Sequence, residues 1–391
     1  ETPLHSSKSL SELLGCRLLL KAENLQRTGS FKVRGAAYRM SFLSADERRR
    51  GVIAASAGNH AQGVALAAQD AGVPCMIVMP QGASIAKVKA TQAYGAAVDL
   101  FGHSFDEAMR RARELARERG LTLVHAFDDP AVVAGQGTLA LELCRQTGDL
   151  DLVVVPVGGG GLIAGMATVL KTLLPKVRVI GVQAEAAPAV VHSFAAKEKR
   201  SVRPASTIAD GIAVGEPGEL PWRIMRRYVD DVVAVPEEEI AWAMVLLLER
   251  AKLLVEGAGA VGLAALLGGH IATRGQTTAV VLTGGNIDPL LLSRVLDHGL
   301  ARQGRFLVLW VPLSDVPGQL AGLLSVVAET GANVVEVIHQ RRGAYISPGQ
   351  ALVELIVETR DAGHASLLME RLRERGYEPL DALPRASTPE E

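Results

Sequence analysis

Residues 150–165 read LDLVVVPVGGGGLIAG, a short apolar run followed by four glycines and a second apolar segment. This order predicts a buried strand, a tight turn and then a helix. Glycines at 158–161 leave the backbone N–H groups free to close on an anion, and the helix N-terminus adds partial positive charge. A phosphate group fits this turn better than the alternative, a flexible linker. No lysine closes the run, so we do not expect a nucleoside triphosphate.

Short apolar runs alternate with helix-period segments on both sides of this turn. Predicted strands without polar alternation lie at 52–56, 74–80, 96–101, 121–127, 150–157, 177–185 and 277–283. Strands of this kind are covered by helices on both faces. The alternation predicts an α/β fold with two open, mostly parallel sheets.

The pattern changes near residue 300. Residues 306–315, FLVLWVPLSD, predict a strand, and the following segments continue in the order β-α-β-β-α-β, with YEPL (377–380) last. This is the ferredoxin-like order of a small α+β domain. The predicted domains are a larger one at 1–300, containing a smaller subdomain at about 52–131, a second at 305–382 and a frayed tail at 383–391.

Composition limits the classes of function. The chain has 391 residues, 48% of them hydrophobic, and a formal net charge of -1. This charge gives no reason to expect nucleic acid or an anionic membrane as a partner. Apolar stretches are shorter than the ~18 residues of a membrane span, and the first residues lack a signal-peptide pattern. Three widely spaced cysteines indicate a reducing compartment, so we predict a cytoplasmic protein.

Two other turns follow predicted strands. In SAGNHAQG (56–63), Ser56, Gly58, Asn59 and His60 crowd a strand-to-helix turn where backbone donors could approach an anion. An ordinary helix start capped by Asn59 is an equal alternative. In LTGGNID (282–288), Thr283 would lie at the carboxyl end of a strand, the edge where open sheets bind ligands. Read alone, this threonine is more typical of a turn.

Lys32 stands in TGSFKVRGAA (28–37), directly after Phe31. A lysine is usually a surface residue. A predicted phosphate turn without a nucleotide signature, however, favours a cofactor that carries its own phosphate, such as pyridoxal phosphate. A desolvated lysine has a lowered pKa, which makes its neutral amine available for a Schiff base.

Five motifs in order, ENLQRTGSFKVRGAAYRM, SAGNHAQGVALAA, VPVGGGGLIAG, TIADGIAVG and LTGGNID, resemble the threonine dehydratases, or threonine ammonia-lyases. These are pyridoxal-phosphate enzymes of fold type II, the tryptophan-synthase-β-like class. The resemblance covers residues 1 to about 300. Beyond it, DVPGQLAGLLSVVAETGANVVEV resembles the start of an ACT domain, a small amino-acid-sensing module. Together they are similar to the medium-length dehydratases with one regulatory module.

The resemblance implies roles for the residues of these motifs. Lys32 would hold the cofactor and act as the base, Phe31 would pack against its ring, and Asn59 would bond to its phenolic oxygen. Thr283 would face the pyridine nitrogen. The phosphate would bind the backbone N–H groups of Gly158, Gly159, Gly160, Gly161 and Leu162. The substrate carboxylate would be received by Ser56, Ala57, Gly58, Asn59 and His60. Asp210, Gly211 and Glu256 would line the same cavity.

Two departures from related enzymes narrow the expected chemistry. The serine racemases carry a serine where this chain has Ala57, and that serine moves a proton on the cofactor face opposite the lysine. Alanine cannot do so, which favours elimination over racemisation. The racemases also bind a divalent ion after a glutamate that matches Glu185, but their second carboxylate corresponds here to Val191. We therefore predict no metal site, while a monovalent ion held by carbonyl groups stays open.

The resemblance implies β-elimination of water from L-threonine, giving 2-oxobutanoate and ammonia, with L-serine giving pyruvate. Alternatives are a serine dehydratase or another β-eliminating or β-replacing enzyme of this fold and, more remotely, a non-catalytic amino-acid sensor. An amino-acid or nucleotide effector would bind the ACT domain near Asp315 and Gly318, with Asn333 a further candidate; Asn333 could equally be a turn residue. Paired ACT modules imply a homo-oligomer, a dimer or a tetramer.

Overall fold

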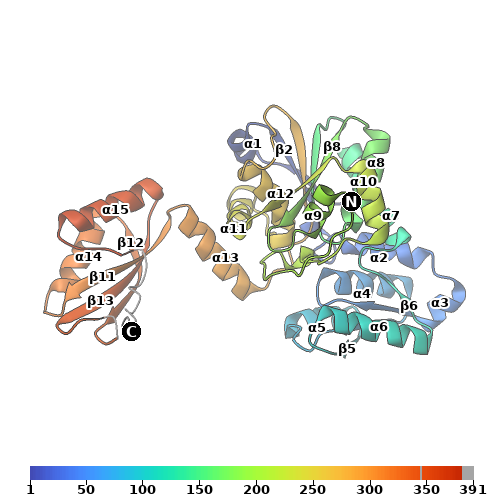
Figure 1. The fold of residues 1–391 in the computed structure, drawn as a ribbon, viewed down its shortest axis with the longest axis horizontal. Coiled ribbons are helices and arrows are strands. Elements are labelled where there is room, and N and C mark those ends of the chain that lie inside the picture. Colours follow the sequence, from blue (N-terminus) through green and yellow to red (C-terminus); the bar gives the residue numbers. More distant parts are fainter. Residues whose placement is uncertain (344–345, 381–391) are drawn as a thin grey trace. The chain divides into compact units, whose positions relative to one another are not determined.

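The computed structural model describes residues 1–343 and 346–380, so the predicted tail at 383–391 lies outside the described residues. The chain divides into two compact units, Glu1–Pro289 and Leu290–Glu391 (Figure 1). The division falls at the start of α13 (Pro289–Arg302), earlier than the boundary at 300 that we expected, because helical periodicity does not reveal to which unit a helix belongs. Among the described helices, none is both long and apolar enough to cross a membrane.

The first unit contains a six-stranded sheet in the order β1-β2-β10-β7-β8-β9, in which only β1 is antiparallel to its neighbour. Its strands are rich in valine and leucine, and β7 and β10 are buried along their whole length. The strands are β1 (Leu4–Ser6), β2 (Arg17–Ala22), β7 (Leu152–Pro156), β8 (Arg178–Ala184), β9 (Asp231–Val235) and β10 (Thr277–Leu282).

Helices cover both faces of this sheet (Figure 1). Successive residues of a strand point to opposite faces, so Val153 and Val155 join the core formed with α7, α8 and α10, while Val154 lies near Gly262 of α12. The sheet is therefore doubly covered, as predicted from its unbroken apolar runs. The helices of this part are α1 (Lys8–Leu14), α7 (Pro130–Gln146), α8 (Gly161–Leu173), α9 (Ala189–Ala196), α10 (Glu219–Tyr228), α11 (Glu237–Leu246) and α12 (Gly257–Leu267).

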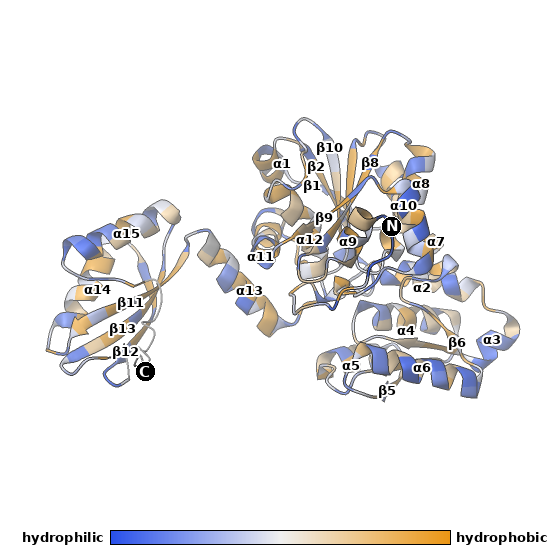
Figure 2. Cartoon of the chain, in the orientation of Figure 1, coloured by the Kyte–Doolittle hydropathy of each residue, from blue (hydrophilic) through white to orange (hydrophobic). Residues whose placement is uncertain are grey.

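The second sheet of this unit has four parallel strands in the order β5-β4-β3-β6. One face packs on α2 and α4, and the other packs on α6 (Figure 2). Because Ala36 and Met40 of α2 belong to this core, the subdomain includes residues before the predicted start at about 52. The elements are α2 (Lys32–Ser41), α3 (Ala45–Arg50), β3 (Val52–Ala55), α4 (Asn59–Ala71), β4 (Cys75–Met79), α5 (Ile85–Ala93), β5 (Ala97–Leu100), α6 (Phe105–Arg119) and β6 (Thr122–Leu123).

One predicted strand is much shorter than expected. The apolar pattern predicted a strand over 121–127, but β6 contains only Thr122 and Leu123. The following carbonyl groups do not continue a ladder; those of Val124 and Ala126 face the side chains of His60 and Lys32.

The second unit contains β11 (Phe306–Ser314), α14 (Gln319–Thr330), β12 (Asn333–Gln340), β13 (Gln350–Glu358) and α15 (Ala362–Glu374). Its sheet has the order β11-β13-β12 and is antiparallel. The last predicted strand, YEPL, is reduced in the described residues to a bridge between Leu380 and Trp310 of β11. This bridge lies on the free edge of β11, as the ferredoxin-like order requires.

Candidate active site

A cavity of about 1290 Å³ lies in the first unit, at the carboxyl ends of β3, β7 and β10. Open parallel sheets bind ligands at this edge because the loops that leave their strands meet there. The cavity brings together every predicted cofactor and substrate residue of this unit. Those that line it are Phe31, Lys32, Ser56, Ala57, Gly58, Asn59, His60, Gly158, Gly159, Gly160, Gly161, Leu162, Asp210, Gly211, Glu256 and Thr283.

Lys32 is the first residue of α2 and projects into this cavity. Its Nζ donates a 3.2 Å hydrogen bond to the carbonyl of Ala126 and lies 5.1 Å from the centre of the Phe31 ring. Burial lowers the pKa of the Lys32 amine to about 8, although the nearby Glu256 opposes this shift. A neutral amine is therefore accessible near physiological pH, which a Schiff-base lysine requires.

The glycine turn at 158–161 leads from β7 into α8. Gly160 has φ of +93°, which a residue with a side chain rarely adopts. A Cβ atom on Gly159 would lie 2.4 Å from the ring of Phe127, and one on Gly161 would lie 2.9 Å from the Phe127 backbone. Because no side chain fits here, the turn offers only backbone groups at the N-terminus of α8. Its residues thus suit a phosphate.

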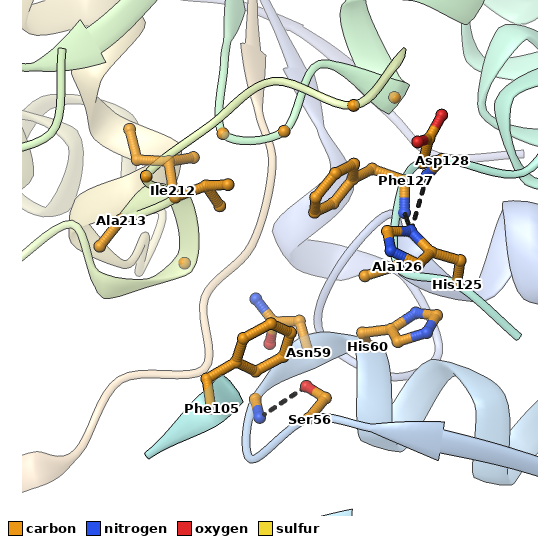
Figure 3. Close-up of a pocket in the computed structure, with 18 of the residues that line it drawn as sticks. Ser56, Asn59, His60, Phe105, His125, Ala126, Phe127, Asp128, Ile212 and Ala213 are labelled. Atoms are coloured by element: carbon orange, nitrogen blue, oxygen red, sulfur yellow. Dashed lines mark hydrogen bonds between the residues drawn. The ribbon is translucent and has the colours of Figure 1, made fainter. Parts of the chain in front are cut away.

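Residues 56–60 form the turn between β3 and α4. The backbone N–H of Gly58 donates to Ser56 Oγ at 3.1 Å, and Figure 3 shows Ser56 near Asn59 and His60. His60 Nε2 lies 2.9 Å from the carbonyl of Val124, and burial lowers the pKa of His60 to about 3. His60 is therefore neutral and donates its proton to Val124. A carboxylate received here would be bound by neutral donors.

Asn59 is held between two side chains. Its Nδ2 donates to Glu256 Oε1 at 2.7 Å, and its Oδ1 accepts from Asn286 Nδ2 at 2.8 Å. Burial first, and Asp210 second, raise the pKa of Glu256 to about 8. Thr283, buried at the end of β10, accepts at its carbonyl from the N–H of Phe31, which ties the lysine segment to this strand. Asn286 belongs to a predicted motif but was not given a role from the sequence.

An ion pair between the two subdomains lies in the lining of the cavity. Lys87 Nζ of α5 lies 3.3 Å from Asp210 Oδ2. Gly211 follows, and a Cβ atom there would lie 3.0 Å from Ala258. Asp210, Gly211 and Glu256 all line the cavity.

The sequence did not predict residues 124–128, VHAFD, as part of the site, although residues 125–128 line the cavity. Figure 3 shows His125, Ala126, Phe127 and Asp128 along one side of the cavity. The N–H groups of Phe127 and Asp128 donate to His125 Nδ1 at 3.3 and 2.9 Å. The signal available was the Asp129–Pro130 pair, in which Asp129 caps α7 and Pro130 is its first residue.

The predicted effector residues of the second unit do not all lie together. Asp315 forms a 2.9 Å ion pair with Arg341, and Gly318 precedes α14 with φ of +92°. Asn333 lies at the other end of the sheet, because it pairs with Glu358 at the end of β13 whereas Ser314 pairs with Gln350 at its start. Within one module, Asn333 is therefore separated from the other two candidates.

Glu185 is exposed, and its backbone N–H donates to the carbonyl of Val235. Val191, at the position of the racemases' second carboxylate, donates its N–H to Gln183 Oε1. In the part of the chain that the structure describes, no three His, Cys, Asp or Glu side chains gather as a metal site would require.

Known proteins match most of this chain. The sequence pattern of a family described as "Pyridoxal-phosphate dependent enzyme" matches residues 1–284. The L-threonine ammonia-lyase of Thermotoga maritima is 48% identical over 377 residues, covering 96% of this chain and 94% of that protein. The processed form of threonine deaminase isoform 2 from Solanum lycopersicum has a TM-score of 0.74 and 38% sequence identity. The match covers 76% of this chain and 82% of the chain of that structure. Maize serine racemase has a TM-score of 0.72 and 34% sequence identity, and the match covers 77% of this chain and 93% of the racemase chain.

Proposed function

Because the chain belongs to the pyridoxal-phosphate dependent enzyme family, we propose that it converts L-threonine to 2-oxobutanoate and ammonia, and L-serine to pyruvate and ammonia. The predicted fold-type-II architecture agrees with the structural matches at 38% and 34% identity. The cofactor is pyridoxal phosphate, as predicted. The proposal rests on one observation above all: the partly buried Lys32 amine, with its lowered pKa, shares a cavity with the glycine turn at 158–161.

Different residues of the cavity would bind different parts of the cofactor and of the amino-acid substrate. The N–H groups of the glycine turn would hold the phosphate, and Lys32 would hold the carbonyl carbon of the cofactor. The turn at 56–60 would bind the carboxylate of the amino acid. When bound, pyridoxal phosphate withdraws electrons from the Cα atom of the amino acid.

Lys32 is the only predicted base of the reaction. Once the amino group of the substrate has displaced Lys32 from the carbonyl carbon of the cofactor, the freed Lys32 amine would take the proton from Cα. The electron pair left behind would form the Cα–Cβ double bond as the Cβ–O bond breaks. The departing hydroxide would take up one proton, which balances the proton removed from Cα, and leave as water. Lys32 would then return to the carbonyl carbon of the cofactor and so release the enamine, which water would hydrolyse to 2-oxobutanoate and ammonia. One water is lost and one consumed, so the reaction balances.

Two residues favour elimination over other outcomes. The Thr283 hydroxyl, unlike a carboxylate, would not hold a proton on the pyridine nitrogen, so the developing charge must leave quickly with hydroxide. Ala57 lines the cavity without a group that can exchange a proton. Reprotonation from a second face, which racemisation needs, then has no donor at this position.

The decisive experiment measures 2-oxobutanoate from threonine, pyruvate from serine and D-serine in parallel. We expect both keto acids and no D-serine, and Lys32→Ala should lower turnover by at least about 10³-fold. Pyruvate without 2-oxobutanoate would favour a serine dehydratase, and D-serine without keto acid would favour a racemase. A colourless protein that borohydride leaves unchanged would favour a non-catalytic amino-acid sensor.

We also propose that the second unit is an ACT domain that senses an amino acid or a nucleotide and that the protein is a cytoplasmic homo-oligomer, a dimer or tetramer. The β-α-β-β-α order of its described elements supports this reading. Keto-acid production with and without isoleucine, valine and a nucleoside monophosphate tests the regulation. Unchanged kinetics with all three would argue against these effectors.

A further inference from the structure

Residues 124–128 join the two sides of the cavity. The carbonyl of Val124 accepts from His60 at the carboxylate turn, and the carbonyl of Ala126 accepts from Lys32. The next two side chains, Phe127 and Asp128, contact the glycine turn and the helix beside it. One short segment therefore contacts the predicted base, the carboxylate turn and the phosphate turn.

Asp128 caps a helix that is distant in sequence. Its Oδ2 accepts from the N–H of Glu219 at 3.0 Å, and its Oδ1 accepts from the N–H of Leu220 at 2.9 Å. These are the first two residues of α10, whose own N-cap residue, Gly218, has no side chain to bond them. Asp128 thus does the task that a capping side chain usually performs locally.

The start of α10 in turn holds the glycine turn. The N–H of Gly218 donates to the carbonyl of Gly159 at 3.0 Å. A Cβ atom on Gly160 would lie 2.7 Å from Met225 and 3.0 Å from Pro221, both on α10. This helix is therefore packed directly against the turn.

Phe127 also packs against the glycine turn. A Cβ atom on Gly159 would lie 2.4 Å from its ring, and one on Gly218 would lie 3.0 Å from both Phe127 and Asp128. His125 packs edge-on against the Phe127 ring, with centroids 4.7 Å apart. The segments 125–128, 158–161 and 218–225 therefore touch at glycines where an added Cβ atom would be crowded.

We propose that Asp128 is a positioning residue for the cofactor phosphate: by fixing the start of α10, it holds the backbone N–H groups of the glycine turn in the geometry that binds the phosphate. Asp128 does not itself touch the phosphate. The inference rests on the family's cofactor and not on the choice of threonine as substrate.

The test is a titration of the cofactor-free protein with pyridoxal phosphate, followed by absorbance, for wild type, Asp128→Ala and Asp128→Asn. Loss of both bonds in Asp128→Ala should raise the Kd about 5-fold to 30-fold. Asp128→Asn keeps one acceptor oxygen, so its Kd should lie between those of the wild type and Asp128→Ala, about 2-fold to 5-fold above wild type. At saturating cofactor, both variants should regain most of the wild-type turnover.

Asp151 supplies a matched control at the opposite edge of the same sheet. Its Oδ2 accepts from the N–H of Thr277 at 2.8 Å, so Asp151→Ala also removes a carboxylate that bonds backbone. It should lower the melting temperature without raising the Kd. An unchanged Kd in Asp128→Ala, or an equal rise in Asp151→Ala, would overturn the proposal. If Asp128→Ala does not fold, a wild-type Kd in Asp128→Asn would likewise overturn the proposal.

The titration needs no substrate, so it separates this inference from the proposed function. A protein that binds the cofactor tightly yet forms no 2-oxobutanoate would contradict the function alone.

Discussion

The side-chain amide of Asn59 donates a 2.7 Å hydrogen bond to Glu256, a carboxyl group that is almost completely buried. Burial, strengthened by the neighbouring Asp210, raises the pKa of Glu256 to about 8. The Asn59 Nδ2 atom carries two hydrogens and gives one to Glu256, so the other is left for a ligand. The Oδ1 atom of Asn59 accepts a hydrogen bond from Asn286. Glu256 therefore fixes the orientation of an amide that we expect to face the cofactor.

This relationship predicts an unusual dependence of stability on pH. Between about pH 5 and 8, the folded protein keeps the Glu256 proton that the unfolded chain loses, so rising pH lowers the free energy of unfolding. The slope for one proton is at most about 1.4 kcal/mol per pH unit. Glu256→Gln cannot ionise and should lose this slope. Denaturant unfolding of the cofactor-free proteins at pH 5, 6.5 and 8 measures it.

The control is Glu118→Gln, because Glu118 is exposed on α6. Its stability curve should run parallel to that of the wild type. If the Glu256→Gln curve also stays parallel, the buried carboxyl group does not titrate in this range.

The lowered pKa of Lys32, about 8, predicts how turnover depends on pH. Only the neutral amine can take the Cα proton, so kcat should rise toward pH 8 and then level off. Well below pH 8 it should fall by about ten-fold per pH unit, as for a single proton. The measurement is kcat from pH 6 to 9.5, with threonine deuterated at Cα to show that proton removal limits the rate. A flat profile, or one that falls toward pH 8, would show that the Lys32 amine does not titrate near pH 8 in the substrate complex.

Close packing at Gly159 predicts a sharp loss of cofactor binding in Gly159→Ala. The added Cβ atom would lie 2.4 Å from the Phe127 ring, and overpacking of this kind costs about 1–3 kcal/mol. The turn must shift, so the Kd for pyridoxal phosphate should rise at least about ten-fold. Gly148→Ala is the control, because no atom lies within 4 Å of its added Cβ. Combining Gly159→Ala with Phe127→Ala should recover part of the affinity; no recovery would show that this contact is not the cause.

Ala57→Ser should give the enzyme some racemase activity. The residue lines the cavity, and a hydroxyl there could return a proton to the face opposite Lys32. We expect D-serine at a few per cent of the pyruvate formed from L-serine, about the level a weakly placed proton donor gives. Chiral chromatography after incubation in heavy water detects it. Ala57→Gly should form none, and pyruvate without D-serine in Ala57→Ser would mean that the hydroxyl does not reach Cα.

The parts of the site that directly follow strands could be predicted from the sequence, because all parallel sheets place such turns at one edge. The glycine turn, the turn at 56–60 and Thr283 each follow a strand, and the carboxyl ends of parallel strands meet at one edge. The placement of Lys32 needed a different argument. Its own segment predicts a surface lysine. The phosphate turn without a nucleotide signature, together with the resemblance to a family with a Schiff-base lysine, predicted that it lies in the cavity.

The segment 124–128 could not be recognised in the same way. LTLVHAF has the composition of a strand, and propensity cannot show that the carbonyl groups after Leu123 bond to side chains instead of to a neighbouring strand. The contact of Asp128 with Leu220 joins residues 92 positions apart, and no local pattern marks it. Tertiary partners of this kind are absent from a single sequence.

A buried ionic cluster beneath α2 gives the last prediction. Arg34 bonds to Glu23 and Glu142, and Lys21 bonds to Glu142 at 2.8 Å. Burial raises the pKa of Glu142, but the hydrogen bonds from Arg34 and Lys21 outweigh it and hold the pKa at about 2. The ionised carboxylate thus stabilises the fold above about pH 5, and this contribution is lost as pH falls toward 2.

Glu142→Gln should lower the free energy of unfolding by about 3 kcal/mol at pH 7, because it leaves Lys21 and Arg34 short of a negative partner in a buried setting. The difference from wild type should shrink as pH falls from 5 to 3. Glu12→Gln removes an exposed pair with Lys8 and should change stability by less than about 0.5 kcal/mol. Urea unfolding at pH 7, 5 and 3 makes the comparison. A difference that does not depend on pH would show that packing, and not the charge of Glu142, stabilises this region.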